Sequence, residues 1–349
     1  TNSVLQTLQK YICISRPRRF GKSITASMIA AYYSRGCDAK ELFSPYKIAR
    51  NLDFDTYRNK YNTLFLNMQE FLSRTKNIYE LLDRMKRLVL RDLKREYPNV
   101  DYFDDTDLIE SMQDVYQETN CPFVVIIDEW DCIFREYKQD KEAQEIYLDF
   151  LRDMLKDKSC IALAYMTGIL PIKKYGTHSA LNMFDEFSMI NPGPLASYVG
   201  FTELEVAALC TDYHMDLDEI KAWYNGYSFE KIPSIYNPRS VVSCMRFGKI
   251  GNYWNQTETF EALQIYIDMN FEGLKDDVLS MIAGESVPVN TGSFTNDMTT
   301  FRTEDDVLTL LIHLGYLSYD YENKTVKIPN NEVREESVSY THLTLPTIC

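Results

Sequence analysis

The feature that most restricts the fold of this chain is an alternation of short apolar runs with longer stretches of helical periodicity. The apolar runs are Tyr11–Ser15, Thr63–Asn67, Phe123–Ile127 and Ile161–Met166, and helical patterns occupy Ile24–Ser34, Ile78–Glu96 and Gln144–Lys156. Phe123–Ile127 is apolar at every position, as in a strand covered on both faces of its sheet. Strands that alternate with helices predict βαβ units, a parallel sheet and therefore an α/β fold.

Composition narrows the class of protein further. The chain has 349 residues, 45% of them hydrophobic and 25% charged, with a net charge of −14. This length predicts about two domains with a sizeable core. The acidic balance excludes a protein that coats nucleic acid through bulk positive charge. No apolar run approaches the about 18–20 residues of a membrane span, so no membrane partner is expected.

Cysteine and histidine usage argues against a disulfide framework or a histidine-based metal site. The eight cysteines are scattered and form no C-x-x-C pair, and there are only four histidines. Reduced thiols in the core of a cytoplasmic protein are therefore expected.

Both ends of the chain are unusual. It opens at Thr1, and Val338–Thr347 resembles a translated sequencing-library adapter. We therefore exclude 337–349 from fold reasoning as an adapter-derived artefact and expect the gene to continue beyond it. A genuine short tail is the alternative.

A phosphate-binding loop is predicted between the first apolar run and the first helix. Gly21, Lys22 and Ser23 supply the last three positions of the pattern G-x-x-x-x-G-K-[ST], although Arg16 stands where the first glycine is expected. Backbone N–H groups at a helix N-terminus bind phosphate, and the lysine follows the β- and γ-phosphates. An ordinary Gly-Lys-Ser helix start is the alternative.

A pair of acids supplies the second half of a magnesium–nucleotide site. Asp128 and Glu129 directly follow the buried run Phe123–Ile127. We expect Asp128 to face the metal and Glu129 to polarise the attacking water. The alternative is a solvated acidic strand end. The intervening strand and the adjacent Glu favour the ATPase branch of P-loop proteins, and the lack of an N-K-x-D motif favours ATP over GTP.

Other polar residues are weaker candidates for the site. Thr167 follows Ile161–Met166, where such ATPases place a residue that senses the γ-phosphate. The loop arginines Arg16, Arg18 and Arg19 would contact phosphate or a neighbouring chain, or would be solvated loop charges. The candidates for a charge-neutralising arginine-finger role are Arg135, Lys173, Lys174 and Arg239.

The second half of the chain reads as helical and then mixed. Thr202-Glu203-Leu204-Glu205 is a capping box that opens a helix. Val307–Leu314 predicts a helix ending at Gly315, and 316–321 with 325–328 predicts a β-hairpin, which together indicate a winged-helix-like region. The predicted divisions are 1–195 for the P-loop ATPase domain, 196–265 for a helical subdomain and 266–336 for the winged-helix-like region.

Several segments together resemble one family. Ser15–Ser23 closely resembles the loop of the bacterial AAA-ATPase-like proteins, in which the P-loop domain is usually followed by a PD-(D/E)XK nuclease-like domain. The remaining segments that recur in that family, in this order, are Ile126–Asp131 (similar to its Walker B strand), Thr167–Ile172, Gly200–Val206, Trp223–Tyr227, Ile235–Pro238 and Leu314–Leu317. The resemblance also accounts for the missing first glycine, because the family typically has Arg-Pro there.

The resemblance implies an ATP site and a missing effector. It implies ATP binding by Gly21, Lys22 and Ser23, and handling of Mg²⁺ and water by Asp128 and Glu129. We also expect the neighbouring loop residues Arg18, Arg19, Phe20 and Ile24 to bind nucleotide, Ser23 to bind the metal with Asp128, and Lys22 and Thr167 to act in catalysis with Glu129. Arg239 departs from the aromatic residue expected after Asn237-Pro238. The nuclease-like domain is absent here, and the (D/E)-x-K strings at 219–221 and 322–324 are read as chance.

The sequence therefore predicts an ATPase that acts as a switch or motor for an absent effector domain. One alternative is a regulatory or scaffold module that binds ATP without significant turnover. Another is a DNA-binding protein that acts through its winged-helix-like region, although the net charge does not support nucleic acid as a partner. Self-association or a partner protein would supply an arginine finger. The aromatic residues at 223–227 and 253–254 are expected in the core or at the interface between the ATPase and helical parts, and base stacking is the alternative.

Overall fold

The computed structural model describes residues 9–172, 181–254, 271, 273–294 and 301–344. The chain divides into two compact units. The first comprises Thr1–Ile14, Lys22–Gly168 and Ile172–Glu186, and the second comprises Ser15–Gly21, Ile169–Pro171 and Phe187–Cys349. The division therefore falls inside the predicted phosphate loop, between Gly21 and Lys22.

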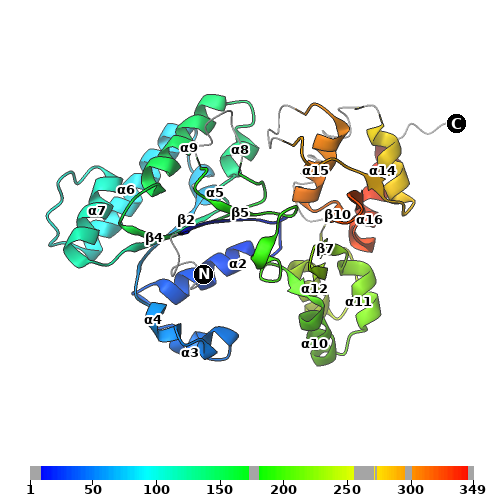
Figure 1. Cartoon of the computed structure of the whole chain (residues 1–349), viewed down its shortest axis with the longest axis horizontal. Coiled ribbons are helices and arrows are strands. Elements are labelled where there is room, and N and C mark those ends of the chain that lie inside the picture. The colour runs from blue at the N-terminus through cyan, green and yellow to red at the C-terminus, as the bar shows by residue number, and fades with distance from the viewer. Residues whose placement is uncertain (1–8, 173–180, 255–270, 272, 295–300, 345–349) are drawn as a thin grey trace. The chain divides into compact units, whose positions relative to one another are not determined.

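A five-stranded sheet with the order β2-β3-β4-β1-β5 organises the first unit (Figure 1). Its strands are β1 (Tyr11–Ser15), β2 (Asn62–Asn67), β3 (Phe123–Asp128), β4 (Ile161–Gly168) and β5 (Asp185–Phe187). Strand β3 pairs in parallel with β2 on one side and with β4 on the other. Every residue of β3 is buried, as its uninterrupted apolar sequence predicts. The predicted α/β class is confirmed.

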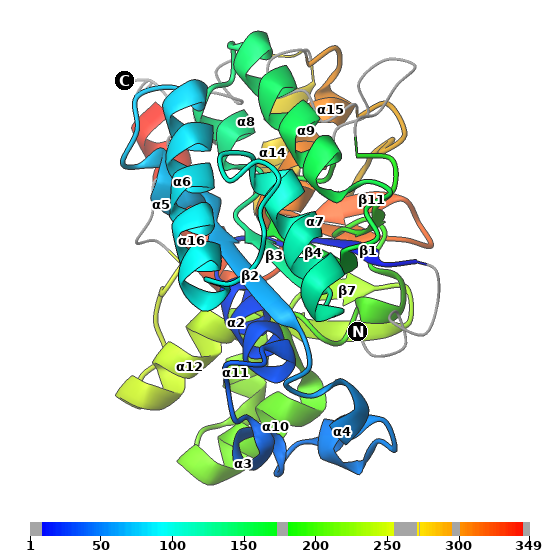
Figure 2. The same cartoon turned by 90° about the vertical axis from the view of Figure 1, so that its left-hand side faces the viewer.

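Helices cover both faces of this sheet. Figures 1 and 2 place α6, α7 and α9 on one face and α2 on the other. The helices of the first unit are α2 (Lys22–Tyr33), α3 (Lys40–Phe43), the 3₁₀ turn η1 (Lys47–Arg50), α4 (Phe54–Tyr57), α5 (Met68–Leu72), α6 (Ile78–Glu96), α7 (Leu108–Thr119), α8 (Cys132–Glu136) and α9 (Lys141–Leu155). Helix α6 has the predicted bounds because Asn77 caps its first turn by accepting from the Glu80 N–H at 3.0 Å.

The second unit begins with a small antiparallel sheet and three helices. Its sheet has the order β6-β8-β7, and its elements are η2 (Gly193–Leu195), β6 (Phe201–Thr202), α10 (Glu203–Tyr213), α11 (Leu217–Tyr224), β7 (Tyr227–Phe229), β8 (Ile232–Tyr236) and α12 (Pro238–Phe247). The predicted capping box is confirmed, since the Thr202 N–H donates to Glu205 Oε2 at 2.8 Å. Tyr224 and Tyr227 are buried, as expected for aromatic core residues.

The rest of the second unit contains the predicted helix and hairpin. Its elements are α14 (Leu274–Ile282), β9 (Val287–Pro288), α15 (Glu304–Leu314), β10 (Ser318–Asp320), β11 (Thr325–Lys327) and α16 (Asn331–Thr344). Strands β10 and β11 pair antiparallel, which confirms the hairpin. Gly315 ends α15 with φ +87°, and a Cβ there would lie 2.7 Å from a side-chain carbon of Pro17. Glycine is therefore required at that helix end.

Two predictions about the organisation of the chain stay predictions. The first is the division of the second half into 196–265 and 266–336, which is finer than the two observed units. The second is the adapter origin of 337–349, a segment whose first residues belong to helix α16, which extends to Thr344. Among the described helices, none combines the length and the apolar character needed to cross a membrane.

Candidate active site

Three polar residues lie side by side where β2, β3 and β4 end. Asp128 is registered opposite Asn67 on β2 and opposite Thr167 on β4. The carboxyl ends of parallel strands meet at one edge of a sheet, which is where α/β proteins build ligand sites. Asp128 and Thr167 were predicted for this site. Asn67, which also caps α5 through the Glu70 N–H at 3.1 Å, was not.

The turn after β3 is fastened to the neighbouring strand. The Trp130 N–H donates to the Thr167 carbonyl at 3.1 Å, and the Glu129 N–H donates to Asp128 Oδ1 at 3.1 Å. Glu129 adopts a left-handed conformation with φ 54°, which is uncommon for a residue with a side chain. Such conformations persist only where the surroundings impose them, and they cluster at functional sites.

Lys22 lies at the start of α2 and is buried beside the acids. Burial lowers the pKa of its ammonium group, while the nearby Glu129, Asp131 and Asp128 carboxylates oppose that shift. The first unit thus brings the predicted lysine and both predicted acids together. Asp131, which the sequence analysis did not single out, is fully buried beside them.

The two predicted acids are both affected by burial. Burial raises the pKa of Asp128, against the opposing effects of a hydrogen bond from Ser23 and of the Lys22 charge. Burial also raises the pKa of Glu129, and Lys22 is the largest influence that lowers it. Asp128 is therefore not a solvated strand-end acid, and Glu129 is partly buried next to the buried Lys22 cation.

Arg135 on α8 pairs with the acids of this same turn. Its NH2 nitrogen lies 2.6 Å from Glu129 Oε2, and its Nε lies 3.5 Å from Asp131 Oδ2. Burial alone would lower the pKa of the guanidinium, but Asp131 and Glu129 raise it above its ordinary value. Arg135 was considered only as an arginine finger from sequence; its contact with Glu129 needed the structure.

Two residues of the predicted phosphate loop, Arg19 and Phe20, make contacts within the second unit. Arg19 donates to the carbonyls of Tyr253 and Trp254, the latter at 3.1 Å. Phe20 is buried edge-to-face against Tyr227, with ring centroids 5.2 Å apart. Gly21 has φ +87°, a conformation that favours glycine. The nucleotide-binding roles of Arg18, Arg19, Phe20, Gly21 and of Ile24, which is 69% exposed, stay predictions.

Arg16 corrects one expectation. It is fully buried, so it is not a solvated loop charge. Its guanidinium packs 4.8 Å from the centre of the Phe229 ring, and its NH1 donates to the Ser15 and Phe187 carbonyls at 2.9 and 3.0 Å. Arg16, which stands in place of the first glycine, therefore binds main-chain carbonyl groups of the second unit.

For the other arginine-finger candidates, the structure gives less information. Arg239 lies in the first turn of α12, where Asn237 accepts from its N–H at 2.9 Å. Lys173 and Lys174 lie outside the described residues.

Two residues of the site, Asn67 and Asp131, were not predicted from the sequence. The sequence pattern that could have indicated them is their position: Asn67 follows an apolar run, as Asp128 does, and Asp131 follows Asp128 by three positions.

The donor atoms present fit a hard metal ion with a phosphate ligand. Asp128 Oδ2 and Thr167 Oγ1 are buried and make no hydrogen bond of good geometry to the described residues. Carboxylate and hydroxyl oxygens next to a lysine ammonium are the groups that bind Mg²⁺ together with phosphate. Of the predicted metal pair, Ser23 lies near enough to Asp128 to lower the pKa of its carboxyl group.

Comparison with known proteins identifies a family for the first half of the chain. The family described as "Predicted AAA-ATPase" matches residues 2–177. An uncharacterized protein from the vnfD 5′ region of Azotobacter chroococcum mcd 1 is 31% identical over 143 residues, which cover 39% of this chain. The match covers 27% of that relative, so the chain spans about a quarter of its length.

Two solved structures from Aeropyrum pernix show weak likeness to this chain. The ORC2 protein, solved as ADPNP–ADP complexes, is 12% identical with a TM-score of 0.38, covering 98% of this chain and 92% of that one. The ORC1 protein, solved in complex with DNA, is 11% identical with a TM-score of 0.27, covering 97% and 91%. The family match covers half of the chain and includes every residue of the site described above, and the chain therefore belongs to the predicted AAA-ATPase family.

Proposed function

We propose that this chain binds Mg²⁺–ATP and hydrolyses its γ-phosphate. The observation that carries the proposal is the gathering of Lys22, Ser23, Asp128 and Glu129 at one edge of the sheet, with Lys22 and Asp128 buried and Glu129 partly buried. A buried ammonium beside two carboxylates with little exposure to solvent is a charge arrangement suited to a bound anion and its metal.

Each residue has a distinct role in this proposal. The Lys22 ammonium binds the β- and γ-phosphate oxygens, and the N–H groups that begin α2 donate to the same phosphates. Ser23 and Asp128 hold the metal, which when bound offsets the charge of the phosphates. Glu129 accepts a hydrogen bond from the attacking water and orients it. Thr167, next to Asp128, donates its hydroxyl to the γ-phosphate.

We further propose that hydrolysis serves a switch or motor for a C-terminal nuclease-like effector in the cytoplasm. Support for this finer statement is the resemblance of the sequence segments to bacterial AAA-ATPase-like proteins. Helix α15 followed by the β10–β11 hairpin supports the proposed winged-helix-like region. The hairpin carries two lysines, Lys324 and Lys327, but the chain as a whole is acidic, which gives DNA binding little support.

Equilibrium binding and turnover together test the proposal. We expect Mg²⁺-dependent binding of a fluorescent ATP analogue to the wild-type chain, weakened at least about tenfold in Lys22→Ala, because a charge-assisted contact contributes about 1.5–3 kcal/mol. The matched control is Lys60→Ala, which removes an exposed lysine of the same unit and should bind as wild type does.

Turnover separates the enzyme from the regulatory alternative. Glu129→Gln should keep binding and lose hydrolysis by about a hundredfold or more. Binding without hydrolysis in every sample would instead favour ATP as a regulatory ligand. Equal binding by wild type and Lys22→Ala would contradict the phosphate site.

A further inference from the structure

Among the described residues of the first unit, the ion pair between Arg135 and Glu129 differs from the other ion pairs in its burial. Arg135 is 10% exposed, Glu129 is 23% exposed and Asp131 is fully buried. The pairs on the outer faces of the helices, such as Arg87 with Asp83 at 2.7 Å, have side chains that are 71% and 63% exposed. Exposed pairs of that kind contribute little, whereas breaking a buried pair leaves an uncompensated charge.

The local fold delivers Arg135 to this position. Helix α8 (Cys132–Glu136) begins three residues after Glu129 and turns the chain back, so that a residue six positions later reaches its carboxylate. The Nε of the same guanidinium faces Asp131, four positions earlier in the chain. One cation therefore joins the two acids that flank Trp130.

Glu129 is fixed at its backbone as well as at its tip. Its left-handed conformation is held by the hydrogen bond to Asp128 and by the bond from Trp130 to Thr167. The Arg135 guanidinium then fixes the far end of the side chain at 2.6 Å. A carboxylate held at both ends has few alternative rotamers, which is what orientation of a water molecule requires.

We propose that Arg135 is a positioning residue, which holds Glu129 so that one carboxylate oxygen is bound to the guanidinium and the other orients the attacking water. This inference rests on the proposed ATPase function. Arg135 makes no contact with nucleotide in this account and acts through Glu129, so it differs from an arginine finger.

Kinetics of Arg135→Ala, Arg135→Lys and Arg87→Ala test the inference. Arg135→Ala should lower kcat about tenfold or more, because a misdirected catalytic group costs up to about a hundredfold. Its affinity for ATP should stay within about twofold of wild type. Arg135→Lys should recover part of kcat, since an ammonium keeps the charge without the fork geometry. Arg87→Ala, which removes an exposed pair, should behave as wild type.

A double-mutant cycle distinguishes action through Glu129 from a separate role. If Arg135 acts through Glu129, the variant Arg135→Ala/Glu129→Gln is no slower than Glu129→Gln alone. Additive losses would overturn the inference, and so would unchanged or faster turnover of Arg135→Ala. A fall in ATP affinity as large as the fall in kcat would overturn it too.

Thermal unfolding keeps the inference testable if wild type shows no turnover. That result would contradict the proposed function by itself. The ion pair then predicts that Arg135→Ala lowers the melting temperature in the wild-type background and lowers it less in the Glu129→Gln background. Equal shifts in both backgrounds would show that the guanidinium does not hold this carboxylate.

Discussion

At the scale of single residues, Gly168 shows how closely the candidate site is packed. A Cβ at this position would lie 2.7 Å from Asp131 Oδ1 and 2.8 Å from two atoms of the Trp130 ring. Neither neighbouring group is the end of a flexible side chain that could move away, because the side chains of Trp130 and Asp131 are both buried in the turn after β3. The end of β4 therefore has room only for glycine.

We predict that Gly168→Ala destabilises the first unit by about 1–3 kcal/mol, the usual cost of an extra carbon in a packed core. Urea denaturation of the variant and of wild type measures the difference. Gly36→Ala is the matched control, because its Cβ would meet nothing closer than 3.7 Å. Equal midpoints for Gly168→Ala and wild type would show that the turn can move aside.

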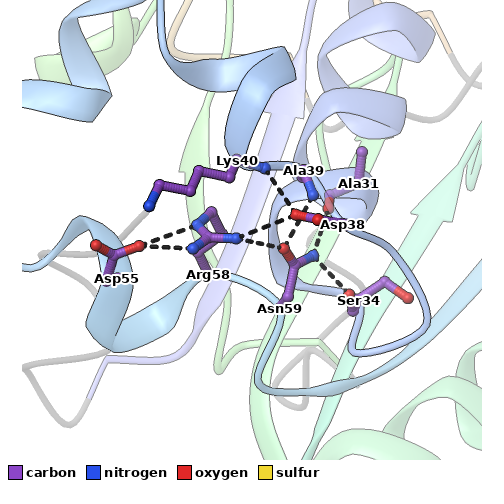
Figure 3. Close-up of polar contacts among 8 residues, drawn as sticks. All are labelled: Ala31, Ser34, Asp38, Ala39, Lys40, Asp55, Arg58 and Asn59. Carbon is purple, nitrogen blue, oxygen red and sulfur yellow. Dashed lines mark hydrogen bonds and ion pairs between the residues drawn. The ribbon is translucent and has the colours of Figure 1, made fainter.

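At the scale of elements, the C-terminal end of α2 is tied to the segment before β2 by Asn59 (Figure 3). Its Nδ2 donates to the Ala31 and Ser34 carbonyls at 3.1 and 2.7 Å. Its Oδ1 accepts from the Ala39 N–H and from Arg58 NH1, both at 3.1 Å. Four contacts from one amide thus connect α2, the start of α3 and the loop after α4.

We predict that Asn59→Ala destabilises the first unit by about 2–4 kcal/mol, because several partly buried hydrogen bonds are lost together. Asn59 has φ 55°, so alanine adds about 1 kcal/mol of backbone strain that Asn59→Gly avoids. Urea denaturation should rank Asn59→Gly between Asn59→Ala and wild type.

An ion pair of the same cluster serves as the control, because its acid, Asp55, is 68% exposed. Asp55→Ala removes the 2.6 Å contact between Asp55 and Arg58 and should change stability little. An Asn59→Ala variant as stable as Asp55→Ala would contradict the role given to the amide.

The elements recovered from sequence are those whose pattern is set by burial. The ranges of β1 and α6 match their predicted bounds, and β3 differs by one residue. The short helices α3 and α4 were missed, since four residues are too few for a 3.6-residue period to register. Of the site, Lys22, Asp128 and Glu129 followed from motif spacing. The contact from Arg135 depends on the turn of α8, which no periodicity reveals.

At the scale of the whole molecule, Glu332 makes stability depend on pH. Its Oε1 accepts from the Tyr253 and Trp254 N–H groups at 2.7 and 2.9 Å, and its Oε2 accepts from the Ser240 hydroxyl at 2.8 Å. Burial raises its pKa to about 7 despite these bonds. One carboxyl on α16 therefore joins segments that are far apart in the second unit's sequence.

The sign of this dependence follows from the raised pKa. The folded state binds the Glu332 proton more tightly than the unfolded chain does. The contribution of this proton to the free energy of unfolding is therefore full below the ordinary pKa near 4.5, and it is lost as the pH rises through about 7. The loss amounts to up to about 3 kcal/mol. Glu332→Gln, which imitates the protonated acid, should be more stable against unfolding than wild type at pH 8. This difference in stability should disappear at pH 4.5.

Urea denaturation of both chains at the two pH values measures this difference. Burial lowers the pKa of His313 to about 3, which makes stability fall as the pH drops below about 6.5 in both chains alike. The comparison between the two chains therefore isolates Glu332. An identical response to pH would contradict its assignment.

A single-turnover experiment measures whether Asp128 and Glu129, at the end of β3, support hydrolysis of ATP. Excess protein is mixed with γ-labelled ATP and Mg²⁺, and released phosphate is followed in wild type and Glu129→Gln. Wild type should release phosphate. Glu129→Gln should retain intact, bound ATP and release phosphate about a hundredfold or more slowly than wild type. Equal release rates from the two proteins, or no ATP bound to either, would contradict the proposed hydrolysis.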